Sequence, residues 1–447
     1  MAVSNTSAEM TARPKLGIYR YYVLALLTLS YLLSYMDRQI LSILIEDIGL
    51  EFAANGRPMS DMAKGLLMGP AFGMFYATLG VPVAMLADNT SRKHIIASAI
   101  SLWSIATAAC AATSGFSSLF VARMMVGVGE AGGTAPAHSL LSDYFKKMEI
   151  SRAIAVFSLG TVLGATIALM AGGLIADLTS WRTTFLIAAT PGIICGILIF
   201  LTVKEPKRGR FEATPARQRR SSYTKALPEL LSNKAYVGTV LSHAFAVFMG
   251  YVITSWGAAL FIRNFEISKT QVGLILGPAI LLGGVPGMMA GGYLSDTLSQ
   301  RDSRWMGWVP SAGCFLCIPI FLSALFVGGA LPMAILFGFG IFVFNIAHAP
   351  SLGIIQTVIP SNMRATGAAF ALLLSNVFGL IIGPPLAGWI SQKLKPAFGA
   401  MSLNYTFAVL LIAMLIAGIG FLWTARQLKD FRILGEAHAD VLKENAV

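Results

Sequence analysis

The chain has 447 residues, of which 56% are hydrophobic and only 12% are charged, and its mean hydropathy is +0.71. Soluble globular proteins carry about 25% charged residues, so the composition excludes a soluble protein and indicates one that crosses a membrane many times. The net charge of +12 is also found in nucleic-acid-binding proteins. Here no basic domain with interleaved aromatic residues accompanies the charge, so we expect no nucleic-acid partner.

Apolar runs of roughly 20 residues, the length that spans a bilayer, recur along the whole chain. The first run contains Asp37 and Arg38, unlike the short apolar core of a cleavable signal peptide, so we expect it to be retained. No segment between the runs is large enough for an extramembrane domain. In chain order the runs predict twelve helices at 21–45, 62–87, 94–114, 117–142, 153–176, 182–203, 236–261, 271–295, 306–328, 331–357, 366–390 and 403–425.

The predicted helices divide six and six around a basic linker. The stretch 204–234 holds nine Lys or Arg against three Glu, and three prolines. The predicted domains are a cytoplasmic leader at 1–20, a first half at 21–203, the linker at 204–235, a second half at 236–425 and a cytoplasmic tail at 426–447.

The positive residues predict the orientation of the helices. The termini and the loops on their side of the membrane hold 24 Lys or Arg, whereas the opposite loops and span ends hold seven. Because Lys and Arg are enriched in cytoplasmic loops, both termini are predicted to be cytoplasmic. The fold class is therefore an all-α membrane protein with twelve transmembrane helices in two halves.

Four charged residues lie inside predicted spans: Asp37, Arg38, Arg123 and Glu130. Each costs about 2.5 to 3.5 kcal/mol at the bilayer centre, so such residues normally face a partner or a water-filled cavity. Counting about 1.5 Å per residue from the cytoplasmic ends puts Glu130 at roughly 20 Å, Asp37 at roughly 25 Å and Arg123 at roughly 30 Å. We therefore predict one cluster with Arg123 above, Asp37 in the middle and Glu130 below. Arg123, with Arg38 as a further candidate, is predicted to hold one of the two carboxylates.

Two roles are open for this cluster. It is either a static ion-pair lock or a switch that binds a proton, and we favour the switch because two carboxylates beside one arginine cannot both be compensated. Glu130 is the better candidate for the proton. Arg38 points about 100° away from Asp37 and is free to serve a second partner or a substrate.

Two short motifs have simpler explanations. Residues 127–132 (GVGEAG) fit the G-x-G-x-x-G dinucleotide fingerprint, but no strand precedes them as that site requires; small residues here allow close helix contact. Cys314 and Cys317 form a C-x-x-C pair with no His or acidic neighbour, so packing is favoured over metal or redox chemistry. We expect no cofactor and no metal.

The two halves carry a weak internal repeat. Asp88 follows the second predicted helix and Asp296 the eighth, and each is trailed by an Arg-Ala pair at the start of a later helix, with Arg152 and Arg364 as the arginines. Internal repeats of this kind are typical of secondary transporters.

Several motifs resemble the major facilitator superfamily. Its loop Gly-x-Leu-Ala-Asp-x-x-Gly-Arg-Lys is matched by 86–93 (LADNTSRK), with Ala84 and Ser91 in place of the glycines, which leaves the tight turn unassured. Further matches are Arg-x-x-x-Gly-x-Gly at 123–129, Trp-Arg at 181–182, and Gly-x-x-x-Gly at 160–164 and 379–383. Within the superfamily the chain resembles the Spinster-like transporters at 35–38 (YMDR), 127–131 (GVGEA), 135–136 (AP) and 143–145 (DYF).

The resemblance implies roles for further residues. In the superfamily the loop after helix 2 packs against helix 11 and its counterpart against helix 5, which implies a cytoplasmic gate of Asp88 with Arg364 and Asp296 with Arg152, flanked by Arg92 and Lys93. The alternative is that these are only solvated charges. A lone histidine is more often a packing residue, so for His348 packing is favoured over a substrate role, which stays open. The substrate-binding candidates are Arg38, Arg123, Tyr251, Ser255, Asn345, His348 and Asn376.

The Spinster resemblance implies a bacterial inner-membrane transporter, expected to be a monomer, that moves a lysophospholipid or sphingoid-type amphiphile. Proton coupling through Asp37, Glu130 and Arg123 is predicted because carboxylates lie within the predicted spans and the sequence has no ATP-binding domain or P-loop. Alternatives are a proton-coupled exporter of drugs or small organic anions, and a non-transporting receptor on the same fold. The sequence contains no G-x-S-x-G and no H-E-x-x-H, so we expect no enzyme.

Overall fold

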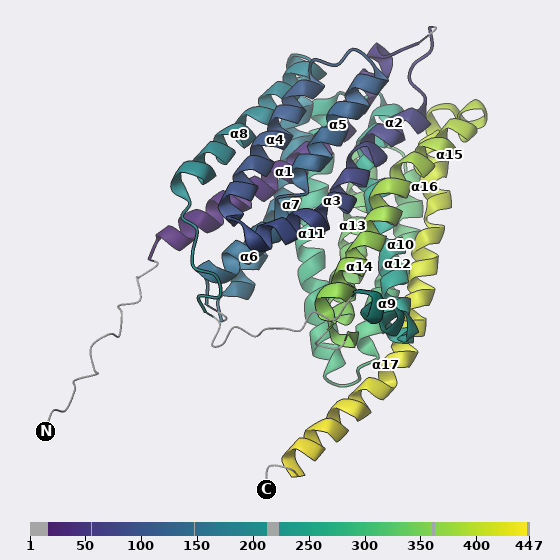
Figure 1. The fold of residues 1–447 in the computed structure, drawn as a ribbon. Helices are drawn as coiled ribbons and strands as arrows, with labels where there is room; N and C mark the ends of the chain where they lie inside the picture. The colour runs from purple at the N-terminus through teal and green to yellow at the C-terminus, as the bar shows by residue number, and fades with distance from the viewer. Residues whose placement is uncertain (1–16, 55, 147, 212–222, 360–362, 445–447) are drawn as a thin grey trace, which may run out of the picture.

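The computed structural model describes residues 17–54, 56–146, 148–211, 223–359 and 363–444 (Figure 1); the side chains at 81, 223–226, 364–365 and 429–444 are outside the description. A first bundle consists of α1 (Tyr19–Glu51), α2 (Asp61–Met68), α3 (Pro70–Asn89), α4 (Arg92–Cys110), α5 (Phe116–Glu130), α6 (Thr134–Tyr144), α7 (Ile150–Leu178) and α8 (Trp181–Thr202).

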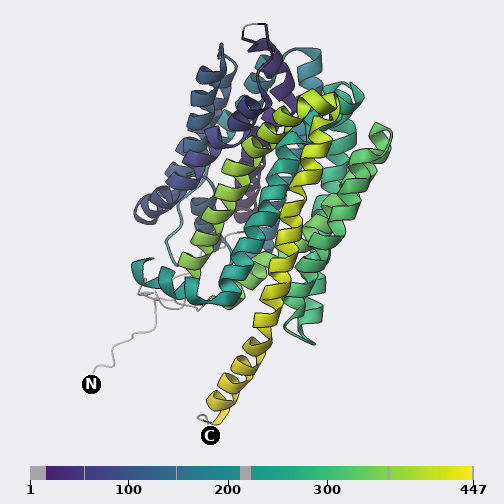
Figure 2. The same ribbon diagram turned by 90° about the vertical axis from the view of Figure 1, so that its right-hand side faces the viewer.

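A short helix, α9 (Tyr223–Ser232), lies across the end of the second bundle (Figure 2), where Leu230 is buried against the end of α13. The second bundle consists of α10 (Lys234–Phe265), α11 (Lys269–Ser299), α12 (Trp305–Phe326), α13 (Ala330–Val358), α14 (Arg364–Asn376), η1 (Val377–Ile382), α15 (Gly383–Phe398), η2 (Gly399–Met401), α16 (Ser402–Leu410) and α17 (Ile412–Glu444).

Each of the twelve predicted spans falls on one helix or on consecutive helices. The breaks have local causes. Between α2 and α3, Gly69 leaves helical geometry and Pro70 follows without an amide proton. Before Pro384 and Pro385 the chain forms the π-helix η1, the local widening by which a helix accommodates a disrupted hydrogen-bond ladder.

The membrane character of the helices is clear in the described part of the chain. Eight helical segments there are long and apolar enough to cross a bilayer, and a ninth is obtained if the 61–80 and 82–89 segments, bent by 41°, form one span. One of the eight, 366–428, contains the reversal of direction at η2. The N-terminal end of α1, the short helix α9 and the C-terminal end of α17 all lie toward the same end of the molecule (Figure 1).

Glycines allow the helices to approach closely, as the small-residue motifs predict. A Cβ atom on Gly164 of α7 would lie 2.3 Å from the Leu32 carbonyl oxygen of α1, and one on Gly273 of α11 would lie 2.3 Å from the Leu169 carbonyl oxygen of α7. The contact of α7 with α11 joins the two bundles. Backbone contact therefore holds together both the first bundle and the interface.

Gly127→Ala is expected to lower the free energy of unfolding by about 1 to 3 kcal/mol, the usual cost of overpacking. The added Cβ would lie 2.3 Å from the carbonyl oxygen of Phe72. Gly80→Ala is the matched control: no atom lies within 4 Å of its Cβ position, so its higher helix propensity should leave stability unchanged or improved. Thermal unfolding in detergent measures both; equal midpoints would contradict the packing argument.

Candidate functional site

The four predicted intramembrane charges come together between α1 and α5. The residues Asp37, Arg123 and Glu130 are 4%, 1% and 2% exposed, and the side chain of Arg38 is 11% exposed. The cluster therefore contains two carboxylates and two guanidinium groups, removed almost completely from solvent. Formal charge is balanced, in contrast to the predicted excess of carboxylate.

Glu130 is paired with Arg38 rather than with Arg123. Arg38 Nε lies 2.6 Å from Glu130 Oε2, and the Ser34 hydroxyl donates to the same oxygen at 2.6 Å. Ser34 and Arg38 are four residues apart, so they share one face of α1, and that face meets Glu130. Among the described residues Arg123 forms no ion pair with Glu130, and Arg38 takes the role of second partner that its direction left open.

The carboxylate of Asp37 has no contact ion pair among the described residues. Its Oδ2 accepts a hydrogen bond from the Thr107 hydroxyl of α4, and its Oδ1 is buried without a hydrogen-bond partner. Arg123 Nη1 lies 3.4 Å from the backbone oxygen of Asp37, and Arg123 Nε is also unpartnered. The Asp37 carboxylate and the Arg123 guanidinium group are thus both buried, but they do not form an ion pair with each other.

Arg38 is surrounded by aromatic rings. The centre of its guanidinium group lies 4.8 Å from the Tyr35 ring, 4.8 Å from the Phe72 ring and 4.3 Å from the Tyr76 ring. Cation–π attraction of this kind is strongest when the groups are desolvated. Because Nη2 still has no hydrogen-bond partner, the guanidinium retains an unused donor.

A small cavity of about 30 Å³ lies beside the cluster, between the two bundles. Seven of its ten lining residues are polar or charged. The predicted residues Arg38, Arg123, Tyr251 and Ser255 are in its wall, and the remaining lining residues are Gln39, Ser42, Met68, Phe72, Thr254 and Leu380. Both bundles therefore contribute polar groups to the cavity.

Three predicted substrate-binding residues are absent from the cavity wall. Asn345 donates to the Ile341 carbonyl oxygen of its own helix at 2.9 Å, and Asn376 is 6% exposed. His348 lies against His243, with ring centroids 5.0 Å apart, and its Nδ1 is buried without a partner. His243 in turn shares a hydrogen bond of 2.7 Å with Ser351. These side chains belong to the packing of the second bundle in this conformation.

An inter-bundle latch closes the end of the interface away from the linker. Its acidic members Glu46, Asp47, Asp61 and Asp177 belong to the first bundle, and its basic members Arg263 and Lys269 to the second. Arg263 Nη2 is 2.7 Å from Glu46 Oε1 and 2.6 Å from Asp61 Oδ1. Lys269 Nζ is 3.1 Å from Asp47 Oδ2 and 2.9 Å from Asp177 Oδ1.

Two of the latch carboxylates, Asp61 and Asp177, have pKa values below their ordinary range. Burial would raise the pKa of Asp177, but the Thr270 amide and the Lys269 ammonium together lower it to about 2. Burial would also raise the pKa of Asp61, but the hydrogen bonds and the positive charge of Arg263 have the larger effect. The pKa of Asp61 therefore lies below its ordinary value. Because these pKa values are depressed, the stabilisation that the carboxylates provide is present above their ordinary pKa and is lost only in strong acid.

The predicted gate residues at the other end are placed differently. Asp296 and Arg152 are both exposed, and the structure shows no ion pair between them. The side chain of Arg364 lies outside the described residues, so its predicted contact with Asp88 is not described. Arg92 is only 2% exposed and is paired with Asp143 within the first bundle in this conformation; its gate role stays a prediction. Lys93 Nζ donates to the Phe200 carbonyl oxygen at 3.3 Å.

Sequence reasoning missed several members of the site. Ser34 and Ser42 lie four residues on either side of Arg38, so their helical face was a signal that could have found them. Thr107 lies on α4, a helix with no intramembrane charge, and nothing in the sequence marked it. The latch was signalled by acidic residues at the span ends of the first half and basic ones in the second, all on the side poor in Lys and Arg.

Comparison with known proteins agrees with this architecture. A family model described as Major Facilitator Superfamily matches residues 27–384. An MFS-type efflux pump of Mycolicibacterium smegmatis is 30% identical over 88% of this chain and 89% of its own. Protein spinster homolog 1 of Homo sapiens is 26% identical over 95% of this chain and 84% of its own. The crystal structure of a bacterial homolog of the human lysosomal transporter Spinster, inward-facing and unoccupied, matches with a TM-score of 0.83 at 24% identity. The match covers 93% of this chain and 98% of that chain.

Proposed function

The chain belongs to the Major Facilitator Superfamily, as a Spinster-like transporter, and we propose that it couples protons to the movement of an amphiphile with an anionic head, of the lysophospholipid or sphingoid type. The observation that carries this proposal is the cavity with two arginines that each keep an unpartnered donor atom, next to a buried carboxylate without a contact ion pair. It is a transporter of small molecules in a membrane, and not an enzyme.

Asp37 is the proposed proton-binding residue, in place of the Glu130 that the sequence favoured. Glu130 is held by Arg38 and Ser34, which stabilise its ionised form. Among the described residues, the Asp37 carboxylate has the Thr107 hydroxyl as its one hydrogen-bond partner. A hydroxyl can accept a hydrogen bond from a protonated carboxyl as readily as it donates to an ionised one. Loss of the proton leaves a charge that attracts Arg123, whose Nη1 already lies at the Asp37 backbone.

The head of the substrate is proposed to bind between Arg38 and Arg123. Both guanidinium groups line the cavity and each has one nitrogen without a hydrogen-bond partner. An anionic group there would accept charge-assisted hydrogen bonds, which are about twice as strong as neutral ones. The hydroxyls of Tyr251, Thr254 and Ser255 come from the second bundle, so a bound head would contact both halves, as alternating access at a midplane site requires.

The conformation is proposed to face the cytoplasm. The latch joins the two bundles at the end away from the linker, and the exposed Asp296 and Arg152 are not joined at the linker end. The excess of Lys and Arg assigns the linker end to the cytoplasm. In the proposed cycle the latch must break for the cavity to open to the outside.

A proton-coupled exporter of drugs or small organic anions is the second candidate. Two findings favour it: the relative from Mycolicibacterium smegmatis is an efflux pump, and the cavity wall is more polar than a lipid tail requires. Both candidates use the same arginines. They differ in whether an apolar tail adds to affinity.

Thermal-shift ranking of ligands on the purified protein separates the two candidates. Lysophospholipids are expected to raise the midpoint of unfolding more than hydrophilic organic anions, and the shift is expected to disappear in the Arg38→Gln variant, which removes the cationic partner of the head. A larger shift with hydrophilic anions would reject the amphiphile in favour of the second candidate. A lysolipid shift that persists in Arg38→Gln would reject the proposed head site.

A further inference from the structure

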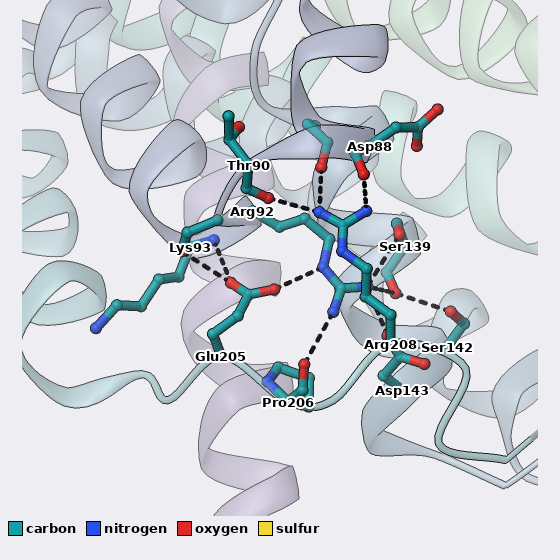
Figure 3. A network of polar contacts seen from close by, with 12 residues as sticks. Asp88, Thr90, Arg92, Lys93, Ser139, Ser142, Asp143, Glu205, Pro206 and Arg208 are labelled. Atoms are coloured by element: carbon teal, nitrogen blue, oxygen red, sulfur yellow. Dashed lines mark hydrogen bonds and ion pairs between the residues drawn. The ribbon is translucent and has the colours of Figure 1, made fainter.

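The start of the linker packs against the first bundle and is hydrogen-bonded to it. We define the linker strap as residues 204–211 (KEPKRGRF), which follow α8. The Tyr144 hydroxyl donates to the Lys204 carbonyl oxygen at 2.5 Å, and the Arg210 amide donates to Asp143 Oδ1 at 3.3 Å. Both ends of the strap are therefore fastened to α6, and the segment between them crosses the turn that joins α3 to α4 (Figure 3).

Arg208 caps the C-terminal end of α3. Its guanidinium group donates to the Ala87 carbonyl oxygen at 2.6 Å, to the Thr90 carbonyl oxygen at 2.5 Å and also to the Asp88 carbonyl oxygen (Figure 3). The last carbonyl groups of a helix have no partner within the helix, and they form the negative end of its dipole. A guanidinium group there satisfies both needs.

The turn itself completes this cap with its own side chains. The Asn89 amide donates to the Met85 carbonyl oxygen at 2.9 Å, and the Thr90 hydroxyl donates to the Leu86 carbonyl oxygen at 2.7 Å. Together with Arg208, they give each of the four consecutive carbonyl groups of residues 85–88 a partner. The capping of α3 is thus divided between the turn and the linker.

Glu205 caps the N-terminal end of α4, where it accepts hydrogen bonds, whereas Arg208 donates them at the end of α3. Its carboxylate accepts from the Lys93 amide at 3.0 Å and from the Ser91 hydroxyl at 3.1 Å, and it pairs with Arg92 Nε at 2.8 Å (Figure 3). A carboxylate is favoured at a helix N-terminus. Burial would raise the pKa of Glu205, but these donors hold it below its ordinary value, so the cap is ionised at neutral pH.

Arg92 fixes the strap to the rest of the first bundle. Its Nη1 lies 2.6 Å from Asp143 Oδ2 and 2.9 Å from the Ser139 carbonyl oxygen, while its Nη2 lies 3.4 Å from the Pro206 carbonyl oxygen. The side chain is 2% exposed. One buried cation therefore holds α6, the strap and Glu205 in a single network.

The strap explains how this turn tolerates residues that differ from the superfamily motif. Ser91 stands where the motif has its second glycine, and the turn has no positive φ: Thr90 has φ of −129° and Ser91 of −69°. No glycine is needed for this backbone. Ser91 instead provides a hydroxyl that donates to Glu205.

We propose that Glu205 and Arg208 are positioning residues for transport: as opposite caps on α4 and α3, they hold the Asp88 turn in the orientation that the cytoplasmic side needs in order to close. Neither residue lines the cavity, so they act on the turn and not on the substrate. The proposal adds the linker to the transport machinery and does not depend on which substrate is carried.

The test compares Arg208→Gln with Lys207→Gln, its neighbour in the same strap. Lys207 is exposed, and the structure shows no hydrogen bond or ion pair for it, so Lys207→Gln removes the same charge from the linker without touching the caps. The reporter is Thr254→Cys in the cavity wall, labelled by a membrane-impermeant maleimide from either side of the membrane. Transport is measured in the same variants without the reporter substitution. The four native cysteines are all buried and provide a low background.

Arg208→Gln is expected to move labelling toward the cytoplasmic side and to lower the maximal transport rate by roughly 5- to 30-fold, the effect of about 1 to 2 kcal/mol of lost hydrogen bonding, with KM unchanged. Lys207→Gln should behave as the parent. Arg208→Lys should recover only part of the rate, because an ammonium group lacks the planar fork that reaches several carbonyls.

Two outcomes would overturn the proposal. The first is labelling and transport in Arg208→Gln equal to those in Lys207→Gln. The second is an unchanged maximal rate with a raised KM, which would place Arg208 in substrate binding. Glu205→Gln is measured beside Arg208→Gln, so that the test does not depend on the folding of a single variant. Glu205→Gln keeps a hydrogen-bonding side chain at the α4 cap and should show the same cytoplasmic shift.

Discussion

Asp37→Asn is expected to abolish the pH dependence of transport while leaving the protein folded. Asn is nearly the same size as Asp and can keep the hydrogen bond with Thr107, but it cannot bind or release a proton. Since the Asp37 carboxylate has no contact ion pair among the described residues, removing its charge breaks no salt bridge. Transport driven by a pH gradient in proteoliposomes measures the effect, and thermal unfolding checks the fold.

Two variants make this result specific. Glu51→Gln removes a carboxylate from the end of the same helix, where Glu51 is bound to Trp181 and Arg182, and should keep the pH dependence. Glu130→Gln removes the partner of Arg38, and breaking a buried pair costs about 3 to 5 kcal/mol, so it should lower stability as well as transport. Parent-like pH dependence in Asp37→Asn would reject Asp37 as the coupling residue.

Arg263→Gln is expected to open the cavity to the outside. Arg263 is the side chain from the second bundle that faces both Glu46 and Asp61, and its side chain is 11% exposed. Its loss leaves Glu46 and Asp61 with Lys64, from their own bundle, as the remaining basic partner among the described residues. At about 1.4 kcal/mol per tenfold change in population, a lost buried pair should shift the equilibrium at least about tenfold toward the outward-facing state.

Labelling of Thr254→Cys from the outside measures this shift. Arg182→Gln is the matched control, because Arg182 lies at the same end but pairs with Glu51 inside the first bundle. Only Arg263→Gln should increase labelling from outside. Equal labelling in the two variants would show that the latch does not hold the conformation. The effect should be independent of pH between mild acid and mild alkali, because the pKa values of Asp61 and Asp177 are depressed.

The helices and the cluster could be predicted from the sequence because they follow from burial alone. A charge inside an apolar run must find a partner, so counting heights was enough to bring Asp37 beside α5. The pairing inside the cluster could not be predicted in the same way. Which guanidinium meets Glu130 depends on the rotation of α1, and a 100° step between Asp37 and Arg38 decides it.

The contacts made by the linker and the latch were also beyond the sequence. Arg208 is one of nine basic residues in a stretch whose composition reads only as a cytoplasmic linker, and nothing local distinguishes it from Lys207. Its role comes from the end of α3, which is far from it in sequence. The expected contact of Asp296 with Arg152 depends on the conformational state, which the sequence does not specify.

Counterflow of a labelled lysophospholipid in proteoliposomes, at an acidic and at an alkaline pH, tests the central claim most directly. The account predicts saturable exchange that changes with pH in the parent and that no longer changes with pH in Asp37→Asn, with the same protein density in both. If the parent exchanges the lysophospholipid saturably but equally at the two pH values, proton coupling is contradicted. If the parent shows no exchange, the proposal that a lysophospholipid is the substrate is contradicted.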